Sequence, residues 1–392
     1  MEELGRTLIV LGSIFFLGLG ADAVARRLRV PRVTLLLLVG LALGPIGFDL
    51  FPDAESAWFP LLSHIALAMI GFLLGESFEL ENLRRHGRAV LGFAAVEVCT
   101  TALVVAGGCL LLGQPLAAAL VLGGIATATD PAASAEVVRE SGASGPFSKT
   151  LIGIVAVDDA LGLLAFSVLL AIGQSLHGSG GLEVLALHSY EVGGGILLGV
   201  VLGVPMSLLT GRVDPGEPTL AEALGGVLLC SGLALWLDVS FLLSCMTLGA
   251  VVTNFAQHHR RPFHAIEGIE WPFMTLFFVL AGASLRTESL VGIGALVPAY
   301  LVLRAIGRLG GGWLASPVVG WELGRSGWMG VALTPQAGVA LGMALVAAER
   351  MPALAEVVLP AAIASTIAFE LVGPLFTRLA LERVGEVELR RR

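Results

Sequence analysis

Two adjacent acidic residues, Asp158 and Asp159, interrupt an otherwise apolar stretch of the sequence, residues 148–172. The stretch has the length and composition of a helix that crosses a membrane, where a charged side chain costs roughly 2.5–3.5 kcal/mol on insertion scales. Two acids at this depth are therefore expected to serve a function rather than packing. A carboxylate can hold either a proton or a small hard cation, whose preferred ligands are oxygens. The pair thus predicts a site at which a proton and a cation compete.

The two carboxylates need not share one role, because neighbouring residues on a helix point about 100° apart. One can face a water-filled cavity while the other faces an adjacent helix. Two arginines, Arg304 and Arg308, lie four residues apart in another apolar segment, 290–316, and hence on one helix face. Either could pair with a buried aspartate. We favour Arg304, which lies deeper in the apolar run, whereas Arg308 could instead extend toward the membrane interface.

Two further apolar segments, 116–138 and 326–347, are each interrupted by a proline among small and polar residues. Proline removes a backbone donor and clashes with the preceding turn, so Pro131 and Pro335 should each break their helix. Within a membrane, the freed backbone groups must be satisfied by protein or water. Asp130 could neutralise the N-terminus of a half-helix. With Asp158 and Asp159, we assign Thr129 and Asp130 to cation and proton binding. Four residues at the breaks are assigned to the support of that site, namely Thr127, Pro131, Thr334 and Gln336.

The whole chain has the composition of a membrane protein. Of its 392 residues, 56% are hydrophobic and only 14% are charged, whereas soluble proteins carry about 25% charged residues. The mean hydropathy is +0.88. Apolar segments long enough to be helices span residues 6–25, 32–49, 58–78, 88–113, 116–138, 148–172, 188–211, 219–236, 239–256, 268–285, 290–316, 326–347 and 356–381. We therefore predict an all-α membrane protein of about 13 transmembrane helices.

The positions of the basic residues predict the orientation. With thirteen spans, most of the 23 Lys and Arg residues fall on one side of the membrane. Because loops rich in Lys and Arg stay in the cytoplasm, the N-terminus is expected outside and the C-terminus in the cytoplasm. Segment 188–211 then links two six-helix blocks of opposite orientation. The fifth segment of each block is broken, a pattern that points to a transporter site near the midplane.

One further acid, Glu370, lies in the segment that corresponds in the second block to the segment of the aspartate pair. We expect it to support the site. The sequence contains no nucleotide-binding loop, no Ser-His-Asp arrangement and no metal-ligand cluster. We therefore expect no enzymatic activity, no cofactor and no nucleic-acid partner.

The residues at the first break and the acidic pair together resemble a known family. Thr129-Asp130-Pro131 followed by Asp158-Asp159 is similar to the monovalent cation:proton antiporter superfamily, the sodium/proton exchangers. Further segments similar to the family, in the family's order along the chain, are residues 26–45, 277–285, 333–341 and 370–374. The resemblance covers nearly the whole chain.

The resemblance implies an architecture and a location. It implies a core subdomain from 88–172 and 290–381, with two broken helices that cross, and a dimerisation subdomain from 1–80 and 219–285. Segment 188–211 would be the linker helix. It also implies a homodimer that works by alternating access in a prokaryotic cytoplasmic membrane, with monovalent cations, protons and the lipid bilayer as partners.

The resemblance also implies residue roles. Asp159 matches the carboxylate that binds the cation and the proton, and Asp158 matches the one that pairs with a basic residue. Arg304 resembles that basic residue, which is a lysine in well-known electrogenic members; arginine keeps its proton at physiological pH. The sequence departs from the family at the second break, where Gln336 and Gly338 stand in place of the arginine and glutamate of many relatives.

The expected function is secondary antiport of Na⁺, or of Li⁺ or K⁺, against protons. The alternative is a sodium-coupled symporter of an organic anion with the related fold, which would need a larger polar cavity and no adjacent acids. A third hypothesis, a ligand-gated potassium efflux system, is disfavoured because such systems usually carry a cytosolic nucleotide-binding domain.

Overall fold

The computed structural model describes residues 2–28, 32–45, 47–48, 58–175, 181–210, 219–256, 260–283, 294–336 and 338–387. Within these ranges every regular element is a helix, which confirms the predicted all-α class. The helices are α1 (Glu2–Leu28), α2 (Arg32–Leu43), α3 (Trp58–Leu74), η1 (Gly75–Phe78), α4 (Leu80–Leu111), α5 (Leu116–Ile125), α6 (Pro131–Ser141), α7 (Pro146–Ser175), α8 (Gly181–Thr210), α9 (Thr219–Trp236), α10 (Phe241–Phe255), α11 (Arg260–Ala283), α13 (Leu296–Leu314), α14 (Ser316–Val319), α15 (Leu323–Ala332), α16 (Gly338–Arg350), η2 (Pro352–Leu354) and α17 (Ala355–Arg383).

Many of these helices are apolar enough to lie in a bilayer. Among the described residues, 7 helices are long and apolar enough to cross a membrane. Four shorter apolar helices accompany them, namely α2, α5, α10 and part of α3. The count of thirteen spans stays a prediction. Parts of the predicted ranges 1–80, 219–285 and 290–381, and residue 211 of the linker segment, lie outside the described residues.

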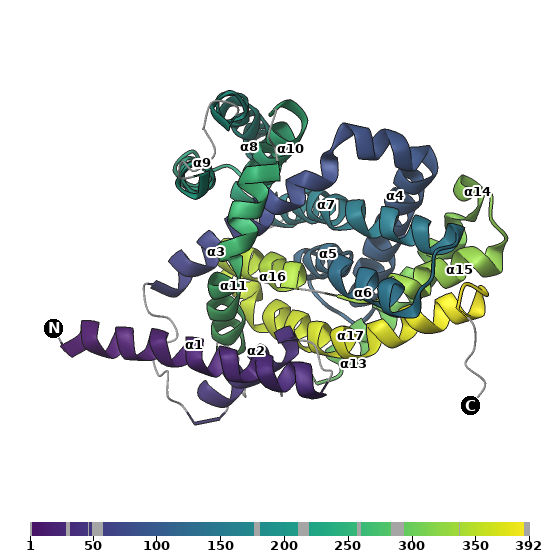
Figure 1. Ribbon diagram of the computed structural model, residues 1–392, viewed down its shortest axis with the longest axis horizontal. Coiled ribbons are helices and arrows are strands. Elements are labelled where there is room, and N and C mark those ends of the chain that lie inside the picture. Colours follow the sequence, from purple (N-terminus) through teal and green to yellow (C-terminus); the bar gives the residue numbers. More distant parts are fainter. Residues whose placement is uncertain are drawn as a thin grey trace.

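The helices form two groups in space (Figure 1). Helices α1 to α3 pack with α8 to α11, and helices α4 to α7 pack with α13 to α17. Glycine allows close approach in the first group, because a Cβ at Gly40 of α2 would lie 2.0 Å from the carbonyl oxygen of Val279 of α11. We call these sets the first and second helix groups. The aspartate pair lies in the second group, on α7.

Both predicted helix breaks are present. The first separates α5, which ends at Ile125, from α6, which begins at Pro131. The second separates α15, which ends at Ala332, from α16, which begins at Gly338; residue 337 lies outside the described part. The two breaks place four helix ends inside the second group, each with backbone groups that need partners.

Candidate functional site

Asp159 is bound to the first helix break. Its side chain is buried, and its Oδ1 accepts hydrogen bonds from both the backbone N–H and the hydroxyl of Thr129, each at 2.9 Å. The structure thus brings together two of the four residues that the sequence assigned to cation and proton binding. Within the described part of the chain both bonds reach the same oxygen, so Oδ2 is the oxygen available to a proton or a cation.

Asp158 has a different neighbour. Its Oδ2 accepts a hydrogen bond from Nη1 of Arg308 at 3.1 Å, and its buried Oδ1 has no partner among the described residues. The prediction that Arg304 pairs with Asp158 is therefore wrong. The prediction that Arg308 could extend to the interface is also wrong, because Arg308 is fully buried.

Arg304 binds the backbone at both helix breaks instead. Its Nε and Nη2 donate to the carbonyl oxygens of Ala126 and Ala128 at 3.0 and 2.7 Å, and its Nη1 donates to that of Thr334 at 2.7 Å. Its guanidinium also lies over the ring of Phe369, 4.4 Å from the centroid. The end of a helix leaves carbonyl groups without partners, and the fixed fork of a guanidinium can serve several at once. The deeper arginine thus neutralises the carbonyl ends of α5 and α15.

Arg308 contacts two buried acids, Glu97 and Asp158, and also the backbone of the first helix break. Its Nη1 donates to Oε2 of Glu97 at 2.7 Å as well as to Asp158. Its Nη2 donates to the carbonyl oxygens of residues 126–128. Glu97, on α4, also accepts a hydrogen bond from the hydroxyl of Thr101 at 2.8 Å. Glu97 was not expected at the site, and Arg304 was preferred to Arg308 as the ion-pair partner. An acid and an arginine deep in two apolar segments are nevertheless a signal for a buried pair.

The polar residues at the breaks satisfy the helix ends. Oδ1 of Asp130 accepts a hydrogen bond from the N–H of Ala133 at 2.9 Å, so Asp130 is the N-cap of α6, as predicted. Pro131 takes the first position of that helix, where no backbone donor is needed. The hydroxyls of Thr127 and Thr334 donate to the carbonyl oxygens of residues 124 and 331, in the last turns of α5 and α15.

Gln336 and Glu370 make contacts away from the aspartate pair. Nε2 of Gln336 donates to the hydroxyl of Ser365 on α17 at 3.2 Å, and its buried Oε1 has no partner among the described residues. Oε2 of Glu370 on α17 accepts a hydrogen bond from the hydroxyl of Thr34 on α2 at 2.7 Å. Glu370 therefore joins the second helix group to the first.

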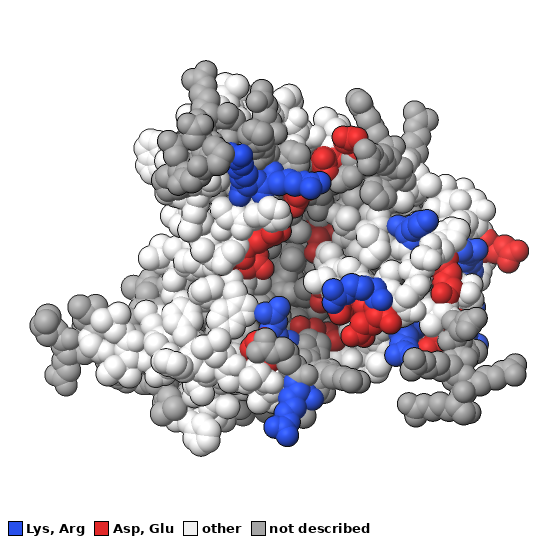
Figure 2. Space-filling model, in the orientation of Figure 1, with Lys and Arg blue, Asp and Glu red and all other residues white. Residues whose placement is uncertain are grey.

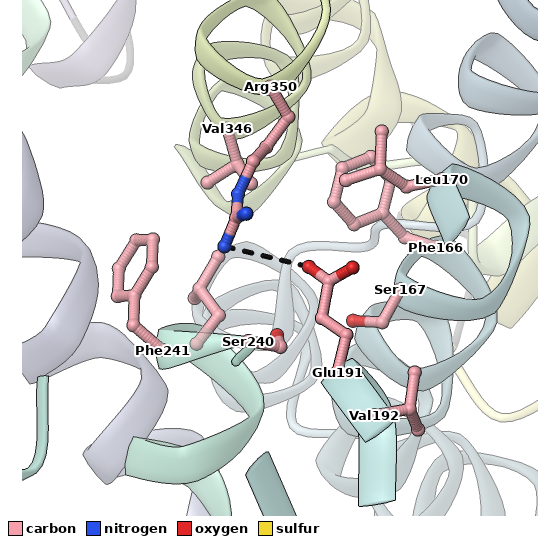
Figure 3. Close-up of a pocket in the computed structure, with 10 residues that line it drawn as sticks. Phe166, Ser167, Leu170, Glu191, Val192, Ser240, Phe241, Val346 and Arg350 are labelled. Atoms are coloured by element: carbon pink, nitrogen blue, oxygen red, sulfur yellow. Dashed lines mark ion pairs between the residues drawn. The ribbon is translucent and has the colours of Figure 1, made fainter. Parts of the chain in front are cut away.

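The end of α16 makes two more contacts to the first group. Oε2 of Glu349 lies 3.3 Å from Nε2 of His64 on α3, and Nη2 of Arg350 lies 3.5 Å from Oε1 of Glu191 on α8. Figure 3 shows Arg350 reaching Glu191 beside a small cavity that Ser167 also lines. The cavity measures about 20 Å³, which is room for roughly one water molecule.

Charged side chains also gather between the two helix groups. Figure 2 shows many of those visible on this face around the hollow between the groups, with uncharged surface at the left. Among the described residues no cluster of three or more His, Cys, Asp or Glu is arranged to hold a metal ion. The buried carboxylate of Asp159 and the hydroxyl of Thr129 lie next to each other at the first helix break.

Residues 11–382 match the family described as sodium/hydrogen exchanger, transmembrane. The chain is a member of the sodium/hydrogen exchanger family. It is therefore a multi-pass integral membrane protein, and the proteins it resembles are transporters rather than enzymes. As a family member it belongs to the cation/proton antiporters.

Known proteins resemble most of the chain. The structure of the sodium proton antiporter MjNhaP1 from Methanocaldococcus jannaschii at pH 8 matches with a TM-score of 0.70 and 22% identity, over 97% of this chain and 96% of that one. The ammonium/H⁺ antiporter subunit AmhT of Alkalihalophilus pseudofirmus is 24% identical over 80% of both chains. The glutathione-regulated potassium-efflux system protein KefC of an Enterobacter species is 26% identical over 83% of this chain, which spans only 53% of KefC.

Proposed function

We propose that this exchanger is a secondary active antiporter that exchanges a monovalent cation, Na⁺ foremost and also Li⁺ or K⁺, for protons by alternating access. The observation that carries the proposal is the double hydrogen bond from Thr129 to one oxygen of Asp159. It fixes a buried carboxylate against the open end of a half-helix and leaves its other oxygen available. A proton on that oxygen excludes a cation, and a cation excludes the proton.

The charges around the site support exchange of a cation. Arg304 and Arg308 are both held by backbone carbonyls of the first break, so their charges offset the negative ends of the half-helices. Asp130 is occupied by the N-terminus of α6. Asp159 therefore presents its negative charge to a cation rather than to a resident arginine. Asp158 is proposed as a second oxygen donor of the same site.

Alternating access would move the two helix groups against one another. We assign the second group to the core subdomain and the first group without α8 to the dimerisation subdomain. Helix α8 would be the linker, and a homodimer the working form. The polar contacts of Glu370, Glu349 and Arg350 with the first group support this division, because each can break without disturbing the site. We also propose the cytoplasmic membrane of a prokaryote, with the N-terminus outside and the C-terminus in the cytoplasm.

The transported cation has more than one candidate. The named relatives act on sodium, ammonium or potassium, and carboxylate and hydroxyl oxygens accept any of them. Symport of an organic anion is not favoured, because the site presents a buried carboxylate pair to its cargo.

The proposal is tested with the purified chain in liposomes that hold an acidic interior and a pH-sensitive dye. Adding Na⁺, Li⁺ or K⁺ outside should collapse the pH gradient, and Asp159→Asn should abolish the response. Ammonium is tested by competition with the binding of radioactive Na⁺ to the purified chain in detergent, because free ammonia collapses the gradient of the liposomes unaided. Collapse by none of the cations, or full activity of the Asp159→Asn variant, would overturn the proposal.

A further inference from the structure

Arg308 has two acidic neighbours but only one positive charge. Glu97 lies closer to its Nη1 than Asp158 does, at 2.7 Å against 3.1 Å. All three side chains are fully buried, so water does not screen the pairs. One of the two acids is therefore in excess over the charge that Arg308 supplies.

The hydrogen bonds distinguish the two acids. Both oxygens of Glu97 are engaged, Oε2 by Arg308 and Oε1 by the hydroxyl of Thr101. Asp158 has one oxygen on Arg308 and one, Oδ1, without a partner among the described residues. A buried carboxylate oxygen without a hydrogen bond is costly. We therefore infer that Asp158, and not Glu97, is the acid that gains and loses a partner during transport.

The backbone places Glu97 for this role. Helices α4 and α13 pack closely through Gly307 and Gly311, where an added Cβ would lie 2.9 Å from the Cα atoms of Thr101 and Glu97 respectively. Two small residues four apart let helices approach in a membrane. Glu97 is thereby held against the face of α13 that carries Arg308.

We propose that Glu97 is the permanent counter-ion of Arg308 and a positioning residue for exchange. It holds Arg308 against the carbonyl groups of the first break, so Asp158 is not required for that purpose and its oxygens are available to the cargo. The part of the proposal that concerns transport rests on the proposed antiport function, whereas the part that concerns stability does not.

Melting temperatures of the purified full chain in detergent test the assignment of the counter-ion. Asp158→Asn leaves the pair of Arg308 and Glu97 intact, so its melting temperature should stay within about 3 °C of the parent. Glu97→Gln keeps the shape and an acceptor oxygen of the side chain but leaves Asp158 as the carboxylate paired with Arg308. Its melting temperature should therefore fall further than that of Asp158→Asn. The double variant leaves Arg308 without a carboxylate and should lose more than the sum of the two single losses. A larger loss in Asp158→Asn than in Glu97→Gln would overturn the proposal.

Transport in liposomes tests the positioning role. In Glu97→Gln the uncompensated Arg308 draws Asp158 toward itself, and the KM for the cation should rise roughly tenfold with a smaller change in the maximal rate. The matched control is Thr101→Val, which removes the hydroxyl from Glu97 but no charge, and its KM should change less than about twofold. An unchanged KM in Glu97→Gln, or an equal rise in Thr101→Val, would contradict the role. If the parent exchanges no cation, the proposed function fails, and the order of the melting temperatures still decides the counter-ion.

Discussion

Asp158 and Asp159 are neighbours in the chain but have different partners in the fold. Asp159 is held by Thr129 at the first helix break, whereas Asp158 meets Arg308 on α13. The divergence follows from helix geometry, because adjacent side chains point about 100° apart. Their substitutions should therefore have different consequences: loss of Asp159 removes the cargo site, and loss of Asp158 removes one oxygen donor.

The hydroxyl of Thr129 should contribute measurably to cation binding. Thr129→Val keeps the backbone donor to Asp159 but removes the hydroxyl donor at 2.9 Å. A hydrogen bond to a charged group contributes about 1.5–3 kcal/mol, so we expect the KM for the cation to change at least roughly tenfold in the liposome assay. The control is Thr127→Val, whose hydroxyl meets the carbonyl oxygen of Gly124 and not Asp159. Equal effects of the two substitutions would contradict the assignment.

At the scale of elements, close helix contact positions the buried charges. An added Cβ at Gly311 would lie 2.9 Å from the Cα of Glu97, whereas at the neighbouring Gly310 the nearest atom would be 3.9 Å away. Gly311→Ala should therefore separate α4 from α13. We expect the free energy of unfolding to fall by about 1–3 kcal/mol, which is detected as a lower melting temperature. Gly310→Ala should be tolerated. Equal losses in the two variants would show that the helix interface does not depend on this contact.

The start of α7 is held by a residue from the end of the chain. Glu386, beyond α17, accepts hydrogen bonds from the N–H groups of Phe147 and Ser148 and from the hydroxyl of Ser148, and it lies 3.6 Å from Arg325. Burial by itself would raise the pKa of Glu386, but the hydrogen bonds and Arg325 together lower it below the ordinary value. A carboxylate at a helix N-terminus also meets the positive end of the helix dipole.

This contact predicts a pH dependence of stability. Because the pKa of Glu386 is lowered in the folded chain, its contribution is present above the ordinary pKa of 4.5 and is lost as the pH falls through the lowered value. Glu386→Gln should thus lower the free energy of unfolding at pH 7 by roughly 1 kcal/mol, with a lower melting temperature. The difference in melting temperature between the parent and the variant should disappear as the pH falls below about 4. Glu382→Gln, which removes an exposed pair with Arg378, should change little. A gap that widens on acidification would contradict the contact.

At the scale of the whole molecule, three polar contacts join the two helix groups, one from α17 and two from the end of α16. They involve Glu370, Glu349 and Arg350 on the second group. If the groups move against one another during transport, these contacts must break and form again. The contacts at the end of α16 would then hold that end closed in the state described.

Loss of the ion pair between Arg350 and Glu191 should make the end of α16 more accessible to water. In a background with the exposed Cys99 replaced by Ser, we would introduce Ser167→Cys, which lines the cavity beside Arg350. Adding Arg350→Gln should raise the rate of labelling by a membrane-impermeant maleimide several-fold, since a partly buried ion pair contributes about 1 kcal/mol. Arg139→Gln, which removes an exposed pair on α6, is the control. An unchanged rate in Arg350→Gln would argue against a closing role.

Much of this arrangement follows from the sequence. The proline motifs located both helix breaks, and the acid before Pro131 was the expected cap. Helical periodicity could not choose between Arg304 and Arg308, because residues four apart share a face. Depth in the apolar run favoured Arg304 as an ion-pair partner, but the deeper arginine meets the carbonyl ends of both broken helices. The pairing with Glu97 depends on α4 lying against α13, which no local pattern specifies.

The central claim is that a proton and a cation compete for Asp159. It is tested most directly by adding Na⁺, Li⁺ or K⁺ to the purified chain in weakly buffered detergent solution and recording proton release with a pH indicator. We predict release of protons that saturates with cation concentration in the parent and is absent in Asp159→Asn. Equal release from both proteins, or none from the parent across the pH range in which it folds, would contradict the claim.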